Sequence, residues 1–354
     1  MSSRDIASPG RRRLHPAVGR ARNAVKAALA EAGWPARVLV ACSGGPDSLA
    51  LAAAVAFYAR RGEVDGHPLE AGAVVVDHGL QEGSGDVART TAGVLAGLGL
   101  SPVRVVAVEV LRSGEGPEAA ARTARLGALE AEAETWGAGA VLLGHTLDDQ
   151  AEQVILGLAR GSGTRSLGGM RSVRGLYVRP FLGLRRADTV EVCEAEGLEP
   201  WLDPTNADPR YMRSRVRADI MPFLEAELGP GVAEGLARTA SILGQDADFL
   251  DAEAAAAYER LVERTPTSRT LLLPGDAVRS LPAALRSRVL ALAVAELGGQ
   301  PTFERLGAVD RLLERRGSAG PVEVPGHVSV HRQPRRKGAP RGTEYGKLVF
   351  VSHR

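Results

Sequence analysis

Lysine is nearly absent from this chain, which carries almost all of its positive charge on arginine. It occurs three times, at Lys26, Lys337 and Lys347, among 44 cationic side chains. Arginine is the better fork for phosphate and stacks on bases, although the alanine- and glycine-rich composition is also typical of a GC-rich genome. The net charge of +2 excludes no class of partner, so the position of the charges matters more than their sum.

Cysteine is scarce, and long apolar runs are missing. Cys42 and Cys193 form neither a CxxC motif nor a zinc-like spacing, which argues against a disulfide framework and predicts a reducing, cytoplasmic compartment. No apolar run approaches the roughly 18 residues of a membrane span. The basic start at Arg11–Arg13 is not followed by the apolar core of a signal peptide. We therefore expect no membrane partner.

Apolar runs alternate with helical patterns through the first part of the chain. Continuously apolar strands separated by helices predict an α/β fold with a parallel sheet and helices on both faces. Right-handed crossovers then bring the strand C-termini to one edge, where ligands bind. The strand-like runs are 38–42, 73–77, 103–110, 141–145 and 176–181, and the helical patterns are 47–61, 86–98, 118–136, 147–158 and 184–197.

The composition divides the chain into four parts. A basic N-terminal arm covers residues 1–29, and the α/β domain covers 30–222. Residues 223–317 form a helix-rich domain without a strand run, with helices at 223–243, 246–264 and 282–297. Residues 318–354 form a small β segment with short strands at 322–324, 327–331 and 348–351 around a basic, proline-bearing loop.

The segment Ser43-Gly-Gly-Pro-Asp-Ser48 joins the first strand to the first helix. Gly44 and Gly45 permit a tight turn and a close approach of backbone to a ligand, and the helix N-terminus attracts anions. These features predict a phosphate loop, in which a divalent cation would reconcile Asp47 with the phosphates. The alternative is an ordinary glycine turn with Asp47 or Ser48 as a helix cap. The loop lacks the GK[ST] ending of a Walker A motif.

A second polar cluster follows the strand at 141–145 and opens a helix. Asp148 and Asp149 lie one helical turn before Glu152, so the three carboxylates share a face. His145 ends the strand, at the edge where ligands are expected. Such a cluster could bind a cation or an ammonium group. The alternative is purely structural, with a threonine as N-cap and the two aspartates favoured by the helix dipole.

Taken together, these segments resemble the tRNA(Ile)-lysidine synthase family of PP-loop ATP pyrophosphatases. The string SGGPDS resembles the PP-loop, and HTLDDQAEQ resembles the family's HTADDQAET, with Leu147 and Gln153 as the departures. The similarity runs from about residue 36 to 222, and the C-terminal third carries no motif that we can match. Further matching segments, in order, are VDHGL at 76–80, Glu118 with Arg122 and Arg125, the loop 160–168, RPFL at 179–182, DPTN at 203–206 and RSRVR at 213–217.

The resemblance implies a reaction with ATP and Mg²⁺. The C2 carbonyl of the wobble cytidine in tRNA(Ile), whose anticodon is CAU, would be adenylated with release of pyrophosphate, and free L-lysine would then attack to form lysidine and release AMP. The resemblance also implies which residues bind the substrates. Asp47 would be the metal ligand, and ATP would contact Ser43, Gly44, Gly45, Pro46, Asp47, Ser48, Val75, Asp77 and His78. Lysine would contact His145, Asp148, Asp149 and Glu152, and the catalytic residues would be Asp47, Asp149, Glu152, Arg213 and Arg217.

Arginines gather in two segments of the chain. Residues 154–186 hold seven arginines and no acid, and such a local excess can neutralise an RNA backbone. The alternative is a solvated face or internal ion pairing. The seven are Arg160, Arg165, Arg171, Arg174, Arg179, Arg185 and Arg186, and a second group is Arg210, Arg213, Arg215 and Arg217. The expected tRNA contacts are Arg122, Arg125, Arg160, Arg165, Arg171 and Arg179, together with the helical domain at 223–317.

Two other functions compete with this interpretation. A PP-loop enzyme that thiolates tRNA would use paired or cluster-binding cysteines, which Cys42 and Cys193 do not provide by spacing. A nucleotide- or RNA-binding module without chemistry would not need Asp47, Asp149 and Glu152 near phosphate. The expected partners are therefore tRNA(Ile) and free L-lysine, and a homodimer is considered.

Overall fold

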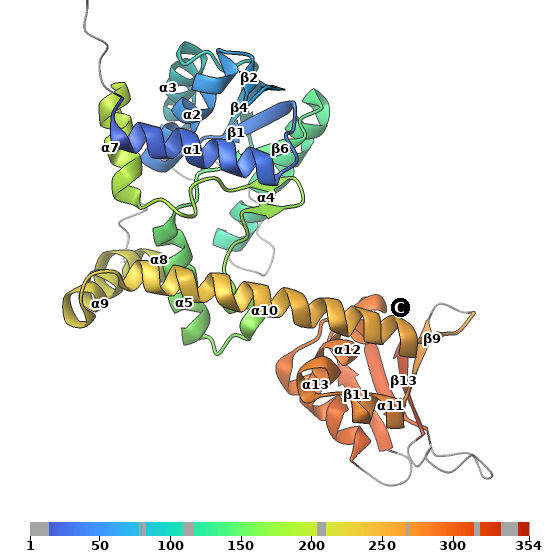
Figure 1. Ribbon diagram of the computed structural model, residues 1–354. Coiled ribbons are helices and arrows are strands. Elements are labelled where there is room, and N and C mark those ends of the chain that lie inside the picture. The colour runs from blue at the N-terminus through green and yellow to red at the C-terminus, as the bar shows by residue number, and fades with distance from the viewer. Residues whose placement is uncertain are drawn as a thin grey trace, which may run out of the picture. The chain divides into compact units, whose positions relative to one another are not determined.

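The computed structural model describes residues 14–77, 79, 83–108, 117–203, 210–266, 269–314, 319–333 and 346–353. The chain forms two compact units, Met1–Ile242 and Leu243–Arg354 (Figure 1). The sequence prediction placed the end of the α/β domain at residue 222, whereas the first unit also contains α9 (Met221–Leu228) and the start of α10 (Val232–Leu261). None of the described helices has the length and apolar character that crossing a membrane requires.

The first unit is built on a six-stranded sheet with the order β5-β4-β1-β6-β8-β7. Five of its strands run parallel, and β7 pairs antiparallel with β8 at the edge. The predicted α/β fold with a parallel sheet is confirmed. The strands are β1 (Arg37–Ala41), β4 (Glu70–Asp77), β5 (Val103–Ala107), β6 (Ala140–Leu143), β7 (Val173–Arg174) and β8 (Tyr177–Val178).

The strand order reverses direction between β1 and β6. From β1 the chain moves outward to β4 and β5, and it then returns to place β6 against the free side of β1. The last registered pair of these two strands is Ala41 with Leu143. A crevice at the carboxyl ends of the strands is expected at such a reversal, because the two connections leave in opposite directions.

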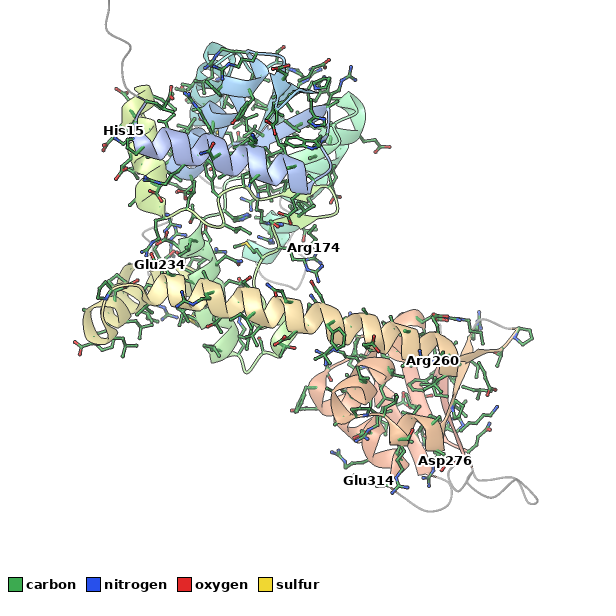
Figure 2. The ribbon with its side chains drawn as sticks, in the orientation of Figure 1. His15, Arg174, Glu234, Arg260, Asp276 and Glu314 are labelled. Atoms are coloured by element: carbon green, nitrogen blue, oxygen red, sulfur yellow. The ribbon has the colours of Figure 1, made fainter. Side chains whose placement is uncertain are left out.

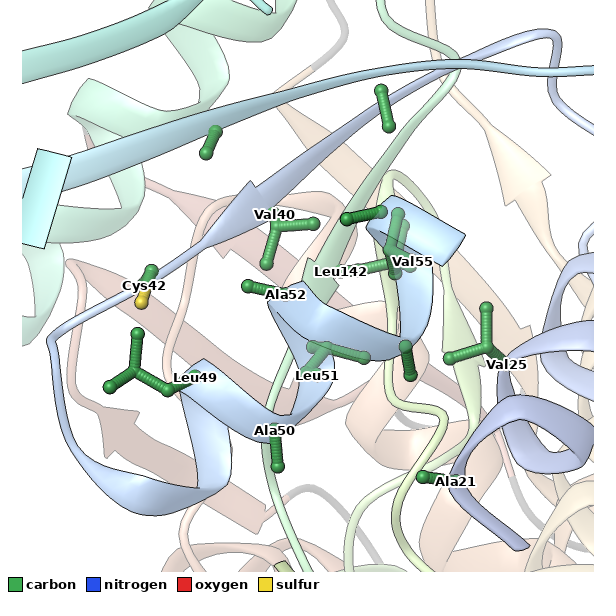
Figure 3. Close-up of a cluster of buried hydrophobic side chains, with 14 of the residues drawn as sticks. Ala21, Val25, Val40, Cys42, Leu49, Ala50, Leu51, Ala52, Val55 and Leu142 are labelled. Carbon is green, nitrogen blue, oxygen red and sulfur yellow. The ribbon is translucent and has the colours of Figure 1, made fainter. Parts of the chain in front are cut away.

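Helices cover both faces of this sheet. The strand period of two sends Val38 and Val40 of β1 into the larger core cluster, while Leu39 enters the smaller one. The larger cluster packs against α1 (Pro16–Glu31), α2 (Pro46–Ala59), α3 (Ser84–Gly97) and α7 (Arg186–Glu196), and the smaller one against α4 (Pro117–Trp136). Figure 3 shows α2 lying between the strand face at Val40 and Leu142 and the side chains of α1.

The N-terminal arm predicted for residues 1–29 is wrong for its second half. Helix α1 is part of the core, with Ala17, Ala21, Val25 and Leu29 fully buried at helical spacing. The prediction followed the basic cluster at Arg11–Arg13 and overlooked this period. Residues 1–13 lie outside the described part of the chain.

A π-helical turn interrupts the helix that follows the sheet. In η2 (Val216–Ile220) the N–H of Met221 bonds the carbonyl of Val216, five residues back. Pro222 comes next and has no N–H for the carbonyl of Ala218, so the regular ladder cannot continue there. Such turns are frequent at functional sites. The remaining elements of this unit are β2 (Glu63–Val64), β3 (His67–Pro68), α5 (Leu147–Ala159), α6 (Thr164–Leu167) and α8 (Met212–Arg215).

The second unit contains an antiparallel sheet with the order β11-β12-β13-β10-β9. Its core gathers inward-facing residues of β10, β12 and β13, such as Leu273, Val330 and Phe350, against α12. The elements are β9 (Glu263–Arg264), β10 (Thr270–Pro274), α11 (Gly275–Ser280), α12 (Ala283–Glu296), α13 (Phe303–Asp310), the 3₁₀ turn η3 (Arg311–Leu313), β11 (Ala319–Val324), β12 (Val328–Arg332) and β13 (Lys347–Ser352).

Two expectations for residues 223–317 are wrong. We expected no strand there, but β10 lies inside the sheet, and its leucine run did not differ by period from a short buried helix. We also expected one helix over 223–243. The sequence Gly229-Pro-Gly231 ends α9, with positive φ at both glycines, and α10 then runs unbroken to Leu261.

Candidate active site

The loop between β1 and α2 is closed by its own polar groups. The hydroxyl of Ser48 accepts from the Ser43 N–H at 3.2 Å and donates to the Gly45 carbonyl at 3.0 Å. Gly44 has a φ of +84°, and a Cβ there would lie 2.6 Å from the hydroxyl of Thr91. The loop therefore requires glycine, and Ser48 has a structural role in it. A contact of Ser48 with phosphate stays a prediction.

Among the described residues, no side chain caps the start of α2. Gly45 is the N-cap residue, and Pro46 occupies the first helical position. The alternative of a capped glycine turn is therefore wrong, because neither Asp47 nor Ser48 bonds the free N–H groups of the first turn. These N–H groups and the positive end of the helix dipole form a site suited to an anion such as phosphate.

The second loop contacts the first directly. A Cβ on Gly144, at the end of β6, would lie 2.9 Å from the carbonyl oxygen of Asp47 and 3.0 Å from the nitrogen of Ser48. Only a glycine fits this approach. The phosphate loop and the acidic helix α5 thus share one edge of the sheet, where the strand order reverses.

Asp149 has the capping role that was the structural alternative, and it also faces the arginines of the site. Its Oδ2 atom accepts from the N–H of Thr146 at 2.8 Å, and the Thr146 hydroxyl accepts from the Asp149 N–H, which forms a capping box at the start of α5. Its Oδ1 atom faces three guanidinium groups at 3.1–3.2 Å, those of Arg186, Arg213 and Arg217. The cap fixes one oxygen and thereby aims the other.

Glu152 is the most deeply buried acid of the site, with 1% of its surface exposed. Arg213 donates from Nε to Oε2 at 2.9 Å, and Arg217 donates from Nε to Oε1 at 2.7 Å. Arg213 comes from α8 and Arg217 from the π-helical turn. The structure therefore brings together four residues predicted as catalytic, with Asp149 and Glu152 as an acid pair held by arginines.

Asp47 joins the same network through α7. The hydroxyl of Thr189 donates to Oδ1 at 2.5 Å, and Nε of Arg186 donates to Oδ2 at 3.3 Å. Burial raises the pKa of Asp47 above its ordinary value although Arg186 and Thr189 favour the ionised form. For Asp149 burial acts in the same sense, but Arg186 and Arg213 hold its pKa below the ordinary value.

Asp148 anchors the start of α7. Its Oδ2 atom accepts from the backbone N–H of Arg186 at 2.7 Å, and its Oδ1 atom lies 3.1 Å from Arg185. Arg185 also pairs with Glu234 of α10, which is labelled in Figure 2. These contacts give Asp148 a structural role, and its contact with lysine stays a prediction.

A cavity of about 240 Å³ opens beside the acid pair. Both acids and arginines line it, so it offers partners to an ammonium group and to a carboxylate. Its walls are formed by Asp148, Glu152, Arg185, Arg186, Arg217, Met221, Pro222 and Glu225. His145 and Asp149, two of the predicted lysine contacts, are not part of these walls.

His145 is held neutral. Burial is the main cause that lowers its pKa to about 4, and the charges of Arg179 and Arg213 add to the effect against the attraction of Asp149. Its Nδ1 atom is buried and has no hydrogen-bond partner among the described residues. Because a neutral imidazole offers one donor and one acceptor, His145 is suited to hydrogen bonding rather than to ion pairing.

The predicted tRNA-binding arginines are not one group. Arg179 is buried, and it donates to the carbonyl of Arg171 at 3.0 Å. The pKa of Arg125 is lowered by the atoms that surround the Arg125 guanidinium and by the charges of Arg122 and Arg213. Arg160, Arg165 and Arg171 lie on the surface. Of the two arginine-rich segments, Arg185, Arg186, Arg213 and Arg217 form internal ion pairs, as the alternative interpretation held.

The expected adenine contacts lie on the strand next to the phosphate loop. Val75 is buried in β4, and Asp77 ends that strand and accepts from the N–H of Gly79 at 3.0 Å. The N–H of Cys42 bonds the carbonyl of Val74, which ties β4 to the start of the loop. His78 lies outside the described residues.

The chemistry of Asp47 fits a magnesium ion that is bound together with ATP. Mg²⁺ takes one or two carboxylates and completes its octahedron with phosphates and water. No group of three or more acids, histidines or cysteines among the described residues could hold a metal. A single carboxylate beside a phosphate loop is the donor set that a nucleotide-bound ion needs.

Comparisons with known proteins agree with this geometry. A family model described as a PP-loop domain matches residues 20–224, and one described as the TilS substrate binding domain matches residues 273–336. The tRNA(Ile)-lysidine synthase of Thermobifida fusca is 51% identical over 95% of this chain and 98% of its own length. That of Leifsonia xyli is 50% identical over 84% of this chain and 88% of its own length.

The chain belongs to the tRNA(Ile)-lysidine synthase family. The fold is shared more widely. The U34-tRNA thiolase NcsA from Methanococcus maripaludis superposes with a TM-score of 0.53 at 17% identity, over 65% of this chain and 80% of that chain. At this identity the similarity concerns the fold alone.

Two residues of this site were missed from the sequence. Arg186 contacts Asp47, Asp149 and Glu152, yet the sequence placed it only in a basic segment. Thr189, one turn later on α7, is 1% exposed and bonds Asp47. A signal existed for α7 itself, since a helix was expected over 184–197, but no spacing rule connects that helix to Asp47.

We predict that Gly144→Ala destabilises the first unit by about 1–3 kcal/mol, because its Cβ meets backbone atoms of Asp47 and Ser48 that cannot move independently. The measurement is urea unfolding followed by tryptophan fluorescence, since Trp34, Trp136 and Trp201 all lie in this unit. Gly93→Ala is the control: nothing lies within 4 Å of its Cβ in α3, so we expect a gain of up to about 1 kcal/mol. Equal unfolding midpoints for the two variants would contradict the close approach.

We predict that His145 makes the first unit less stable in acid. Its pKa is about 4 when folded against an ordinary 6.5, so the unfolded chain binds the proton first and stability is lost as the pH falls below 6.5. Between pH 7 and 5 the loss amounts to about 2 kcal/mol or less. His145→Gln should lose correspondingly less stability over this range in the same unfolding assay. If both proteins respond identically to pH, His145 is not held neutral by the fold.

Proposed function

We propose that this chain joins free L-lysine to the wobble cytidine of tRNA(Ile) with a CAU anticodon, as a ligase that forms a C–N bond and converts ATP to AMP and pyrophosphate. The observation that carries the proposal is the contact between the phosphate loop and the acidic helix. Gly144 packs on Asp47, and Arg186 joins Asp47 to Asp149 and Glu152. One site can therefore activate the cytidine and receive the amine.

The first step uses the phosphate loop. The C2 carbonyl oxygen of the cytidine attacks the α-phosphate of ATP, a P–O bond forms, and pyrophosphate leaves. The uncapped N–H groups at the start of α2 stabilise the negative charge that develops. Asp47 would hold Mg²⁺, which supplies further charge neutralisation at the phosphates when it is bound. The adenine would lie along the ends of β1 and β4, beside Val75 and Asp77.

The second step uses the acid pair. The amine of lysine attacks C2, the new C–N bond forms, and AMP leaves with the former carbonyl oxygen. Lysine must attack as a neutral amine, so a carboxylate of Asp149 or Glu152 takes its proton. The neighbouring cavity of about 240 Å³, with Glu152 and Arg217 in its walls, would hold the rest of the amino acid. Arg213 and Arg217 then face the adenylated intermediate.

Binding of tRNA would use the surface arginines around this edge. Arg122 and Arg125 lie in α4, and Arg160 follows α5, so the backbone phosphates of an anticodon loop would meet cations beside the site. Arg165 and Arg171 extend this surface, and the buried Arg179 holds the backbone of Arg171 by a hydrogen bond to its carbonyl. The substrate places the reaction in the cytoplasm. The homodimer stays a prediction, which sedimentation would test.

The alternative of tRNA thiolation has little support in the site. Cys42 and Cys193 are both buried. Burial raises the pKa of Cys42, and it raises the pKa of Cys193 to about 12, so neither thiol is poised as a nucleophile or cluster ligand. A binding module without chemistry would have no use for Asp47 and the buried Asp149 and Glu152 at the phosphate loop.

The test of the proposal is nucleoside analysis of tRNA(Ile) after incubation with ATP and labelled lysine. We expect the label in a modified cytidine, together with AMP and pyrophosphate, and none with tRNA(Met) or without ATP. Transfer of sulfur without a need for lysine would replace the proposal by thiolation. Binding of ATP and tRNA without turnover would replace it by a binding module.

We predict that substitutions of Asp47 and Glu152 separate the two steps. Asp47→Asn should lower pyrophosphate release by a factor of about 100 or more while tRNA affinity stays near normal, because charge stabilisation at the phosphates is lost. Glu152→Gln should raise the KM for lysine by about tenfold and leave adenylation measurable, because an amide pairs weakly with an ammonium group. If Glu152→Gln loses ATP binding with an unchanged KM for lysine, the acid pair does not receive the amine.

A further inference from the structure

One guanidinium group lies between the phosphate loop and the acid pair. Arg186 donates from Nε to Asp47 at 3.3 Å, from Nη2 to Asp149 at 3.2 Å and from Nη1 to Glu152 at 3.4 Å. All three nitrogens of its fork therefore have an acidic partner. No other described cation is in contact with both Asp47 and the acid pair.

The backbone holds Arg186 in this place. It is the first residue of α7, and Asp148 accepts from its N–H at 2.7 Å. Asp188 closes the same turn by accepting from the Arg185 N–H at 2.9 Å. One turn further on, Thr189 bonds Asp47. The start of α7 is thus tied to the acidic helix on one side and to the phosphate loop on the other.

The charges of this network balance before any substrate binds. Asp47, Asp149 and Glu152 carry three negative charges, and Arg186, Arg213 and Arg217 carry three positive ones. Asp149 and Glu152 are buried and the other four side chains are partly buried, so an added charge is poorly screened. An ammonium group that approaches the acid pair therefore competes with arginines already there, unless a new anion attracts one of them.

We propose that Arg186 is a positioning residue that couples the two substrate sites, so that lysine binds well only when the nucleotide is in place. The inference rests on the function proposed above. Triphosphate at the loop supplies the anion that draws the Arg186 fork toward the phosphates and weakens its hold on Asp149 and Glu152. The ammonium group of lysine takes the vacated partners. By linkage, lysine in turn strengthens nucleotide binding by the same factor.

Such a coupling prevents unproductive binding of lysine. Lysine that reached the acid pair before the cytidine is activated would occupy the site without a reaction. Arg186 makes the acid pair unattractive until the nucleotide has arrived, and it does so with no moving domain, because one side chain contacts both places. Arg213 and Arg217 form ion pairs with the acid pair but do not contact Asp47. Neither of them therefore links the acid pair to the phosphate loop.

The test is calorimetric titration of lysine into the full chain with Mg²⁺, with and without α,β-methylene-ATP, which cannot be cleaved at the reacting bond. We expect the nucleotide to lower the Kd for lysine by about fivefold or more in the unaltered protein, within the usual range of coupling. In Arg186→Gln the two Kd values should agree within about twofold, with lysine binding tighter than in the unaltered protein when the nucleotide is absent.

Two further variants keep the result decisive. Arg186→Lys retains the positive charge, so it folds if the glutamine variant does not. One ammonium group cannot bond all three acids, and we therefore expect the coupling to fall toward that of the glutamine variant. Arg20→Gln is the matched control, because Arg20 pairs with Asp188 at the same turn of α7 but outside the site. It should keep the full coupling.

Three outcomes would overturn the inference: lysine affinity that ignores the nucleotide in the unaltered protein, coupling that survives in both Arg186 variants, or coupling that is lost equally in Arg20→Gln. Failure of the proposed function is distinct. In that case no lysidine forms in the nucleoside assay, whereas lysidine formed by a protein without coupling would contradict only the role of Arg186.

Discussion

The parallel pairing of β1 with β6 is the constraint on which the site depends. Because these strands end level with each other, at Ala41 and Leu143, the loops that follow them must share the same small volume. Gly144 shows how close they come, since even a methyl group would meet the backbone of Asp47. The phosphate loop and the acidic helix are thus neighbours through sheet topology, and no flexible segment has to bring them together.

The second constraint is the cost of burying carboxylates. Asp149 is almost fully removed from water, which would favour its neutral form if it stood alone. Arg186 and Arg213 hold the pKa of Asp149 below its ordinary value. The three arginines that contact the acid pair come from three successive elements, α7, α8 and the π-helical turn. The elements around the sheet are therefore needed to supply the positive charges of the site. The small net charge of the chain is compatible with this dense network of internal ion pairs.

Sequence reasoning succeeded where one element carries the signal. The apolar runs predicted β1, β4 and β6, and glycines with a following helix predicted the phosphate loop. Sequence reasoning failed where a contact depends on how separate elements pack together. Arg186 is one arginine among many along the chain, and only the packing of α7 against α2 turns it toward Asp47. The strand β10 failed for a different reason, because a run of leucines fits a short helix equally well.

The case of Asp149 shows why structural and chemical interpretations of one residue need not compete. A carboxylate has two oxygens, and the capping box uses Oδ2 while Oδ1 points at the arginines. The helix cap thereby removes the rotational freedom that would otherwise be lost when a substrate binds, which is a form of preorganisation. The sequence pattern that predicts the start of α5 therefore also predicts a carboxylate of fixed orientation, that of Asp149. Stability of α5 and the aim of Asp149 therefore depend on the same hydrogen bonds between Thr146 and Asp149.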